Sequence, residues 1–125
     1  TEAEWEYAAR GGEDSLYAGG SDLSTLGWYE DNSGGQSQRV GQLRPNGYGL
    51  YDMSGNVWEW VWDGYGEYSA SPSADPTGIN TASRRVYRGG CWGNFPRYAR
   101  VSGRNHFDPG SRGYDLGFRL FRTIP

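Results

Sequence analysis

The segment PNGYGLYDMSGNVWEWVW, residues 45–62, decides the fold of this chain. In its second half Trp58, Trp60 and Trp62 alternate with other residues at a period of two, which predicts a β-strand. Side chains two residues apart leave the same face of a strand, so the three indole rings share one face. We expect that face to lie in the core; the alternative is a stacking platform for sugars.

The rest of the chain predicts one helix and a few short strands. Residues Thr1–Arg10 predict a helix, because Thr1 and Glu4 fit a capping box and two glycines follow Arg10. Short strands are predicted at Arg85–Arg88 and in Leu116–Arg122. Residues 13–46 are broken by Gly, Ser and Asp, which predicts loop with at most two short strands. These elements define a loop-rich α+β domain.

Composition supports a folded single domain and excludes several classes of protein. The 125 residues include 21 Gly and six Pro but also six Trp, ten Tyr and four Phe, whereas disordered chains lack aromatic residues. A net charge of −3 gives no attraction for nucleic acid. No run approaches the ~18 apolar residues of a membrane span, so we expect no membrane insertion. The chain contains no signal peptide, and its cell-surface, secreted or phage-associated location stays open.

Four phrases carry a family resemblance when they are taken together. They are TEAEWEYAARGG at residues 1–12, the segment at residues 45–60, RVYRGGCW at residues 85–92 and LGFR at residues 116–119. In this order they resemble the formylglycine-generating enzyme (sulfatase-modifying factor) family. The resemblance implies its variant of the C-type lectin fold, α+β with few short antiparallel strands, as one C-type-lectin-like domain over residues 1–125. Family members carry a further stretch before this point, so we expect the chain to be the C-terminal part of a longer domain.

The same resemblance speaks against the family's enzymatic activity. Its enzymes oxidise a cysteine of a sulfatase with copper held by two cysteines, which lie a few residues after the Gly-Gly of the third phrase. This chain has one cysteine, Cys91, and one thiolate does not make a copper(I) site. The single histidine, His106, cannot supply the histidine cluster of the related sulfoxide-forming iron enzymes. We therefore expect no catalytic residues and no copper.

A second resemblance lies in residues 88–120, which resemble the variable region of proteins diversified by diversity-generating retroelements. There, adenines of a template copy are replaced at random, so an asparagine codon can become Tyr, Phe, His, Asp, Gly or Ser. Cys91 is reachable from an AGC serine codon in the same way. We expect the ligand-binding residues to be the ones that such codons reach, together with Ser111: Gly93, Asn94, Phe95, Tyr98, Asn105, His106, Phe107, Ser111, Tyr114 and Asp115.

The composition of residues 91–115 independently favours a binding surface. The segment mixes aromatic rings with small polar residues and shows no burial period, as the binding loops of antibodies do. The alternative is an ordinary surface loop between two strands, although long loops in small domains are usually functional. Its arginines, Arg97, Arg100, Arg104 and Arg112, are interpreted as scaffold first and as anion contacts second.

Gly55, Asn56, Val57 and Glu59 resemble the family segment that binds a structural calcium ion. Backbone carbonyls and a carboxylate suit this hard cation. The alternative, left open with equal weight, is that Glu59 pairs with an arginine such as Arg119.

The sequence therefore predicts a variable protein that displays a diversified surface toward an unidentified protein or surface ligand. Two alternatives remain open. One is a sulfatase-modifying-factor enzyme or accessory protein whose active site lies partly outside this chain. The other is a lipoprotein-type structural interaction module of the same fold.

Overall fold

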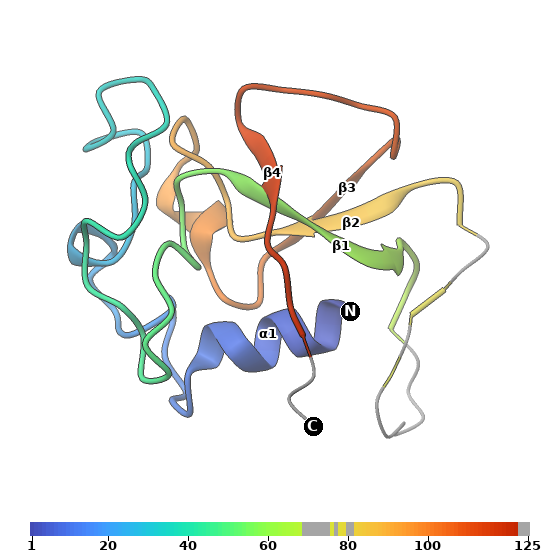
Figure 1. Ribbon diagram of the computed structural model, residues 1–125, viewed down its shortest axis with the longest axis horizontal. Coiled ribbons are helices and arrows are strands. Elements are labelled where there is room, and N and C mark those ends of the chain that lie inside the picture. Colours follow the sequence, from blue (N-terminus) through green and yellow to red (C-terminus); the bar gives the residue numbers. More distant parts are fainter. Residues whose placement is uncertain (69–75, 77, 80–81, 123–125) are drawn as a thin grey trace.

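The computed structural model describes residues 1–68, 76, 78–79 and 82–122 of the chain. The described elements are one α-helix, two 3₁₀ helices and four strands, in the order α1 (Glu2–Arg10), η1 (Leu23–Thr25), β1 (Trp58–Gly64), β2 (Arg85–Arg88), η2 (Pro96–Ala99), β3 (Arg104–Phe107) and β4 (Leu116–Phe118). Helix α1 lies against one face of the sheet, and loops of residues 11–57 gather at one end of it (Figure 1). No described helix has the length and apolar content needed to cross a bilayer.

Helix α1 begins and ends where the sequence predicts. The Thr1 side chain accepts a hydrogen bond from Glu4 N, the Glu4 side chain returns the capping box, and Gly11 ends the helix in the left-handed conformation at φ 59°. Trp5 and Ala9 are buried on the face toward the sheet, where they pack with Met53 and Val101.

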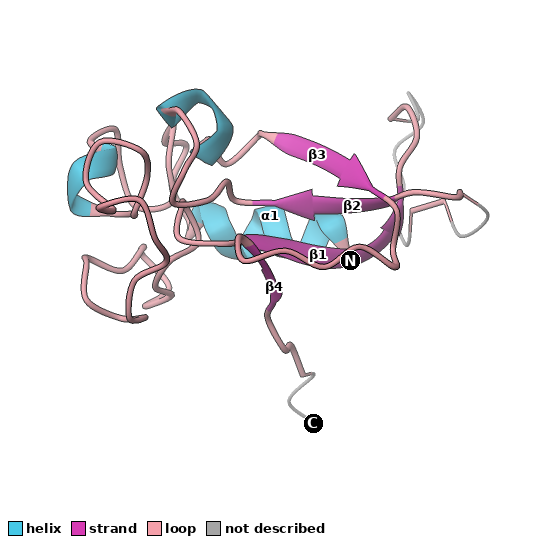
Figure 2. Ribbon diagram, turned by 90° about the horizontal axis from the view of Figure 1, so that it is seen from above, coloured by secondary structure: helices cyan, strands magenta, loops and turns pink. Residues whose placement is uncertain are grey.

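The four strands form one mixed sheet in the order β3-β2-β1-β4. The pairs β1–β2 and β2–β3 are antiparallel, whereas β1 and β4 are parallel. We expected antiparallel strands only, so the parallel pairing of β4 corrects that expectation. The cause is the connection at residues 108–115, which returns across the sheet face opposite α1, so that β4 runs in the same direction as β3 (Figure 2).

The tryptophans of β1 correct a second expectation. They do share one face, but it is the face away from α1, and only Trp58 is buried there. Trp60 is half-buried and Trp62 is 70% exposed, with the Arg85 guanidinium over its ring. The helix-facing side of β1 instead carries Glu59, whose carboxylate accepts from the Trp5 indole at 2.7 Å.

Residues 91–115 are more ordered than their sequence predicts, since they hold the helix η2 and the strand β3. Pro96 starts η2. Strand β3 pairs with β2, so that its Arg104 and His106 side chains lie opposite Arg88 and Val86, on the side of the sheet that faces α1. Residues 13–46, by contrast, are loop as expected, apart from η1 and an isolated bridge between Tyr17 and Gly20.

A buried ionic network joins α1 to the sheet. Arg88 is fully buried and donates to Glu2, to Glu6 at 2.6 Å and to the Val101 carbonyl at 2.7 Å. Arg104 donates to both oxygens of Glu2, at 2.9 and 2.7 Å. Burial opposes the charge of Arg88, but the hydrogen bonds and charges of Glu6 and Glu2 outweigh burial and raise its pKa. The network fixes β2 and β3 against the helix.

Candidate ligand-binding groove

Two adjoining hollows lie on the sheet face opposite α1, and we call them together the display groove. Their volumes are about 380 Å³ and 200 Å³, and both are lined by Trp58, Tyr87 and Asp115. The larger hollow, the ring hollow, is completed by Gly93, Asn94, Phe95, Tyr98 and Asn105. The smaller one is completed by Phe107, Ser111, Arg112, Gly113 and Leu116.

The display groove collects most of the residues that the sequence nominated. Eight of the ten candidates line it: Gly93, Asn94, Phe95, Tyr98, Asn105, Phe107, Ser111 and Asp115. They come from the loop before η2, from η2, from β3 and from the connection to β4. Residues up to 22 positions apart in the sequence thus meet over the same two floor residues, Trp58 and Tyr87.

The structure places the other two candidates elsewhere. His106 alternates with Asn105 and Phe107 along β3 and lies on the opposite side, with its ring 3.7 Å from that of Tyr65. Tyr114 is 97% exposed and lines neither hollow.

Two aromatic residues outside the nominated set, Trp58 and Tyr87, form the floor. The Trp58 ring meets the Tyr87 ring edge-on at 4.7 Å and the Tyr98 ring edge-on at 6.5 Å. Tyr87 lies opposite Asn105 on the neighbouring strand, so both side chains leave the sheet on the groove side. The alternation in Arg85–Arg88 could have indicated the position of Tyr87. It places the Tyr87 side chain on the opposite face of the strand from the buried Val86.

Local hydrogen bonds shape the groove wall at η2. The Asn94 carboxamide accepts from Cys91 N at 3.1 Å, and Glu30 N donates to the Asn94 carbonyl at 3.2 Å. Gly90 turns the chain out of β2 at φ 76°, and a Cβ there would stand 3.0 Å from the Ala99 backbone. The wall is therefore held mainly by backbone groups, and the side chain of the lining residue Asn94 takes part in it.

The arginines of this segment divide between two roles. Arg104 acts as scaffold through Glu2 and the Gly66 carbonyl. Arg97 instead lies over the rings of Tyr98 and Phe95, with 4.8 and 5.6 Å from its guanidinium carbon to the ring centres. Arg97 thus covers the Phe95 and Tyr98 rings at the rim of the groove and pairs with no carboxylate among the described residues.

Cys91 lies below the groove and does not fit a copper site. Its side chain is buried, and its sulfur is 3.8 Å from an Asp115 carboxylate oxygen. Burial raises the pKa of the Cys91 thiol, and the negative charge of Asp115 raises it further. Copper(I) requires thiolates, whereas this chain offers one cysteine held in the protonated form.

The expected calcium segment is largely occupied by internal contacts. Glu59 accepts from Arg119 at 2.7 Å and from Trp5, which is the ion pair that the sequence analysis held as the alternative. Asn56 accepts from Gln38 N through its carboxamide and from Trp92 N through its carbonyl. The sequence analysis missed Asp52, which is buried and has one carboxylate oxygen, Oδ1, with no hydrogen-bond partner. That oxygen fits a hard cation, whereas Glu59 would have to share its charge with Arg119.

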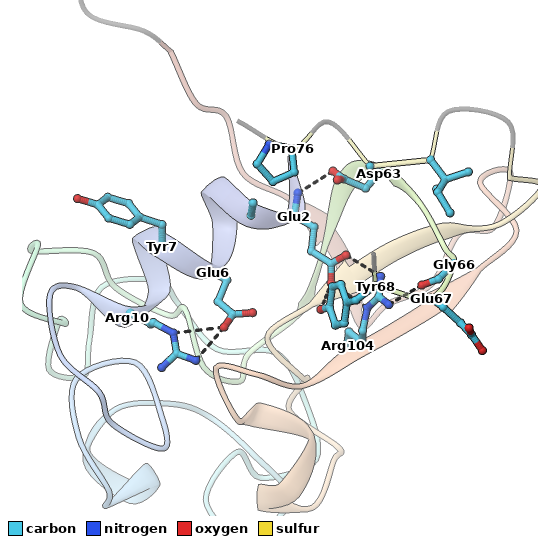
Figure 3. A pocket seen from close by; sticks show the side chains of 14 residues that line it. Glu2, Glu6, Tyr7, Arg10, Asp63, Gly66, Glu67, Tyr68, Pro76 and Arg104 are labelled. Carbon is cyan, nitrogen blue, oxygen red and sulfur yellow. Dashed lines mark hydrogen bonds and ion pairs between the residues drawn. The ribbon is translucent and has the colours of Figure 1, made fainter. Parts of the chain in front are cut away.

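A larger hollow, of about 730 Å³, lies on the α1 side of the sheet (Figure 3). Both of its arginines are paired with glutamates, Arg104 with Glu2 and Arg10 with Glu6, whereas Glu67 has no recorded partner among the described residues. Because both arginines are paired within the chain, the hollow offers little to an anionic ligand. Volume alone therefore does not identify the binding site.

A short helix packed on a small mixed sheet, with long loops that build a groove on the opposite face, defines the C-type lectin type of fold. Comparison with known proteins gives the family. The profile of the Sulfatase-modifying factor enzyme 1-like domain matches residues 1–124. The chain belongs to the family of the formylglycine-generating enzymes.

Both resemblances drawn from the sequence are confirmed by individual relatives. The formylglycine-generating enzyme of Streptomyces coelicolor is 40% identical over 139 residues, which cover 95% of this chain and 44% of that protein. Among solved structures, Treponema denticola variable protein 1 matches with a TM-score of 0.90 and 43% identity, over 94% of this chain and 44% of that one. PvdO from Pseudomonas aeruginosa matches with a TM-score of 0.85 and 33% identity, over 94% and 49%. The chain thus spans less than half the length of these relatives.

Proposed function

We propose that the chain is the ligand-binding part of a variable protein of a diversity-generating retroelement. The observation that carries this proposal is the gathering of eight of the ten nominated residues in one groove. The similarity to Treponema denticola variable protein 1 supports it. The ligand is a protein or surface group that is recognised by whichever side chains the groove displays.

The division of contacts explains how such a groove could vary without unfolding the domain. Gly93 and Phe95 are exposed, and Asn105 makes its one described contact to the neighbouring His106 N–H. The framework below depends on Trp5, Arg88 and the backbone of η2 instead. Exposed substitutions usually change stability by no more than about 0.5 kcal/mol, so the framework tolerates replacement of exposed groove residues such as Gly93 and Phe95.

Sequencing the source DNA around this coding region tests the proposal. We expect a near-identical copy of codons 88–120 beside a reverse transcriptase gene, with adenines at the positions where the two copies differ. Isolates of the source should then differ at the groove codons and agree elsewhere. A source genome that contains neither the template copy nor the reverse transcriptase would refute the proposal.

The family's enzymatic activity is the competing function, and no feature of the described residues favours it. It predicts bound copper and conversion of a cysteine-containing sulfatase peptide. Detection of either with the purified protein would replace display by catalysis.

We also propose that the chain binds a structural calcium ion, with Asp52 as one of its ligands. The unpaired Asp52 Oδ1 supports this, because a buried carboxylate oxygen without a partner is costly. Calcium at about 100 times its dissociation constant would stabilise the fold by about 2.7 kcal/mol. The melting temperature should therefore fall on addition of a chelator, and should fall less in Asp52→Asn. An unchanged melting temperature in the parent protein would refute the ion.

A further inference from the structure

The ring hollow combines aromatic surface with one acidic side chain. Trp58, Tyr87 and Tyr98 supply three rings, related by the edge-on contacts of 4.7 and 6.5 Å described above. Asp115 is half-buried and lines both hollows of the groove. Its charge reaches the floor: burial raises the pKa of Tyr87, and the Asp115 carboxylate raises it further.

Asp115 is not neutralised by the described part of the chain. Its recorded side-chain contact there is the long one to the Cys91 sulfur, and it takes part in none of the ion pairs among the described residues. No arginine lines the ring hollow. Arg97 lies over two of its rings, Tyr98 and Phe95, but pairs with no carboxylate among the described residues, and Arg112 belongs to the smaller hollow without pairing with Asp115. A half-buried carboxylate attracts a cation more strongly than one in bulk water.

We infer that the display groove of this chain binds a cationic side chain, arginine or lysine, of a protein ligand. The inference rests on the proposed function and names the chemistry that this variant selects. A guanidinium or ammonium group in the ring hollow would meet the Trp58 and Tyr87 rings that line it and form a charge-assisted hydrogen bond to Asp115. The volume of about 380 Å³ is enough for one long side chain.

The groove of another variant would select differently. Asp115 is a residue that an asparagine codon reaches in one adenine replacement, so under the proposed function Asp115→Asn is a substitution that the same mechanism could produce in another variant. That substitution keeps the shape of the side chain and removes its charge. The preference for a cation is therefore a property of this sequence and not of the family.

A matched pair of peptides tests the inference on the full chain. Acetyl-Gly-Arg-Gly-amide carries the cation, and acetyl-Gly-citrulline-Gly-amide is its neutral isostere. Binding is followed by NMR shifts of the Trp58 indole during titration. We expect the arginine peptide to bind at least tenfold more tightly than the citrulline peptide, and Asp115→Asn to remove that difference.

Asp108→Asn is the control for net charge, because Asp108 is exposed in the same segment and lines neither hollow. It should leave the preference for arginine intact. Equal binding of the two peptides, no binding of either, or an undiminished preference in Asp115→Asn would overturn the inference. The genomic test is independent: a missing template would refute diversification and leave the cation site standing, whereas equal peptide binding would refute the cation site alone.

Discussion

Replacing Arg88 by methionine should cost this fold about 3–5 kcal/mol. Methionine fills much of the same buried volume, so the change isolates the loss of charge and hydrogen bonds. Removing one member of a buried ion pair costs about 3–5 kcal/mol, since the partner keeps an uncompensated charge. Here Glu2 retains Arg104 and Glu6 retains Arg10, which limits the electrostatic loss. The Val101 carbonyl loses its 2.7 Å donor, which adds about 1–3 kcal/mol.

Urea unfolding followed by tryptophan fluorescence measures the effect. With a slope of about 1.5–2 kcal/mol per molar, the midpoint should fall by about 1.5–3 M. Arg10→Met is the matched control: it removes a cation from the same Glu6, but the side chain of Arg10 is 36% exposed. That exposed pair is worth about 0.2–1 kcal/mol. If the two variants lost the same stability, the buried network would not be what holds α1 on the sheet.

Three further predictions use other parts of the structure. Phe95→Ser and Tyr114→Ser should each change the free energy of unfolding by no more than about 0.5 kcal/mol, because both side chains are exposed; a loss above 2 kcal/mol would place them in the framework. Cys91 should react slowly with iodoacetamide at pH 8 in the folded protein and quickly in urea, since burial raises its thiol pKa; equal rates would contradict that environment. Burial opposes ionisation of Glu6, but the hydrogen bonds and charges of Arg88 and Arg10 outweigh burial and lower its pKa. Glu6 therefore stabilises the folded state above about pH 4.3, and this stabilisation disappears as the pH falls through the lower pKa of the folded state. Glu6→Gln should therefore flatten the acid limb of the stability profile, and an unchanged profile would show that Glu6 does not contribute.

The local elements could be predicted from the sequence because each depends on a short-range signal. The capping box fixes the start of α1, and alternation fixes β2 at Arg85–Arg88. Alternation also showed that the β1 tryptophans share a face, but not which face the helix would cover. The helix covers the face that carries Glu59, because the buried Glu59 carboxylate accepts from Trp5 and Arg119. These partners lie 54 and 60 residues away in sequence.

The candidate site was predictable in its residues and not in its shape. We nominated these residues because asparagine codons can become them and because the segment resembles a variable region. Neither argument gives the positions of the residues in space. Strand β3 has no apolar alternation to reveal it, because its interior side is Arg104 and His106. Arg104 points inward only because Glu2, 102 residues earlier, neutralises it. No local rule would therefore have separated Asn105 and Phe107, which face the groove, from His106, which does not.

That alternation in β3 also explains how one segment can serve both framework and display. A strand exposes successive side chains on opposite faces, so replacement of Asn105 or Phe107 leaves the inward contacts of Arg104 unchanged. The same holds in β2, where Tyr87 floors the groove and Arg88 anchors the helix. Under the proposed diversification, in which adenines are replaced, an arginine encoded by a CGN codon would not change. Framework arginines encoded in that way would stay constant while the groove between them changes, and the binding surface could be exchanged without redesigning the core.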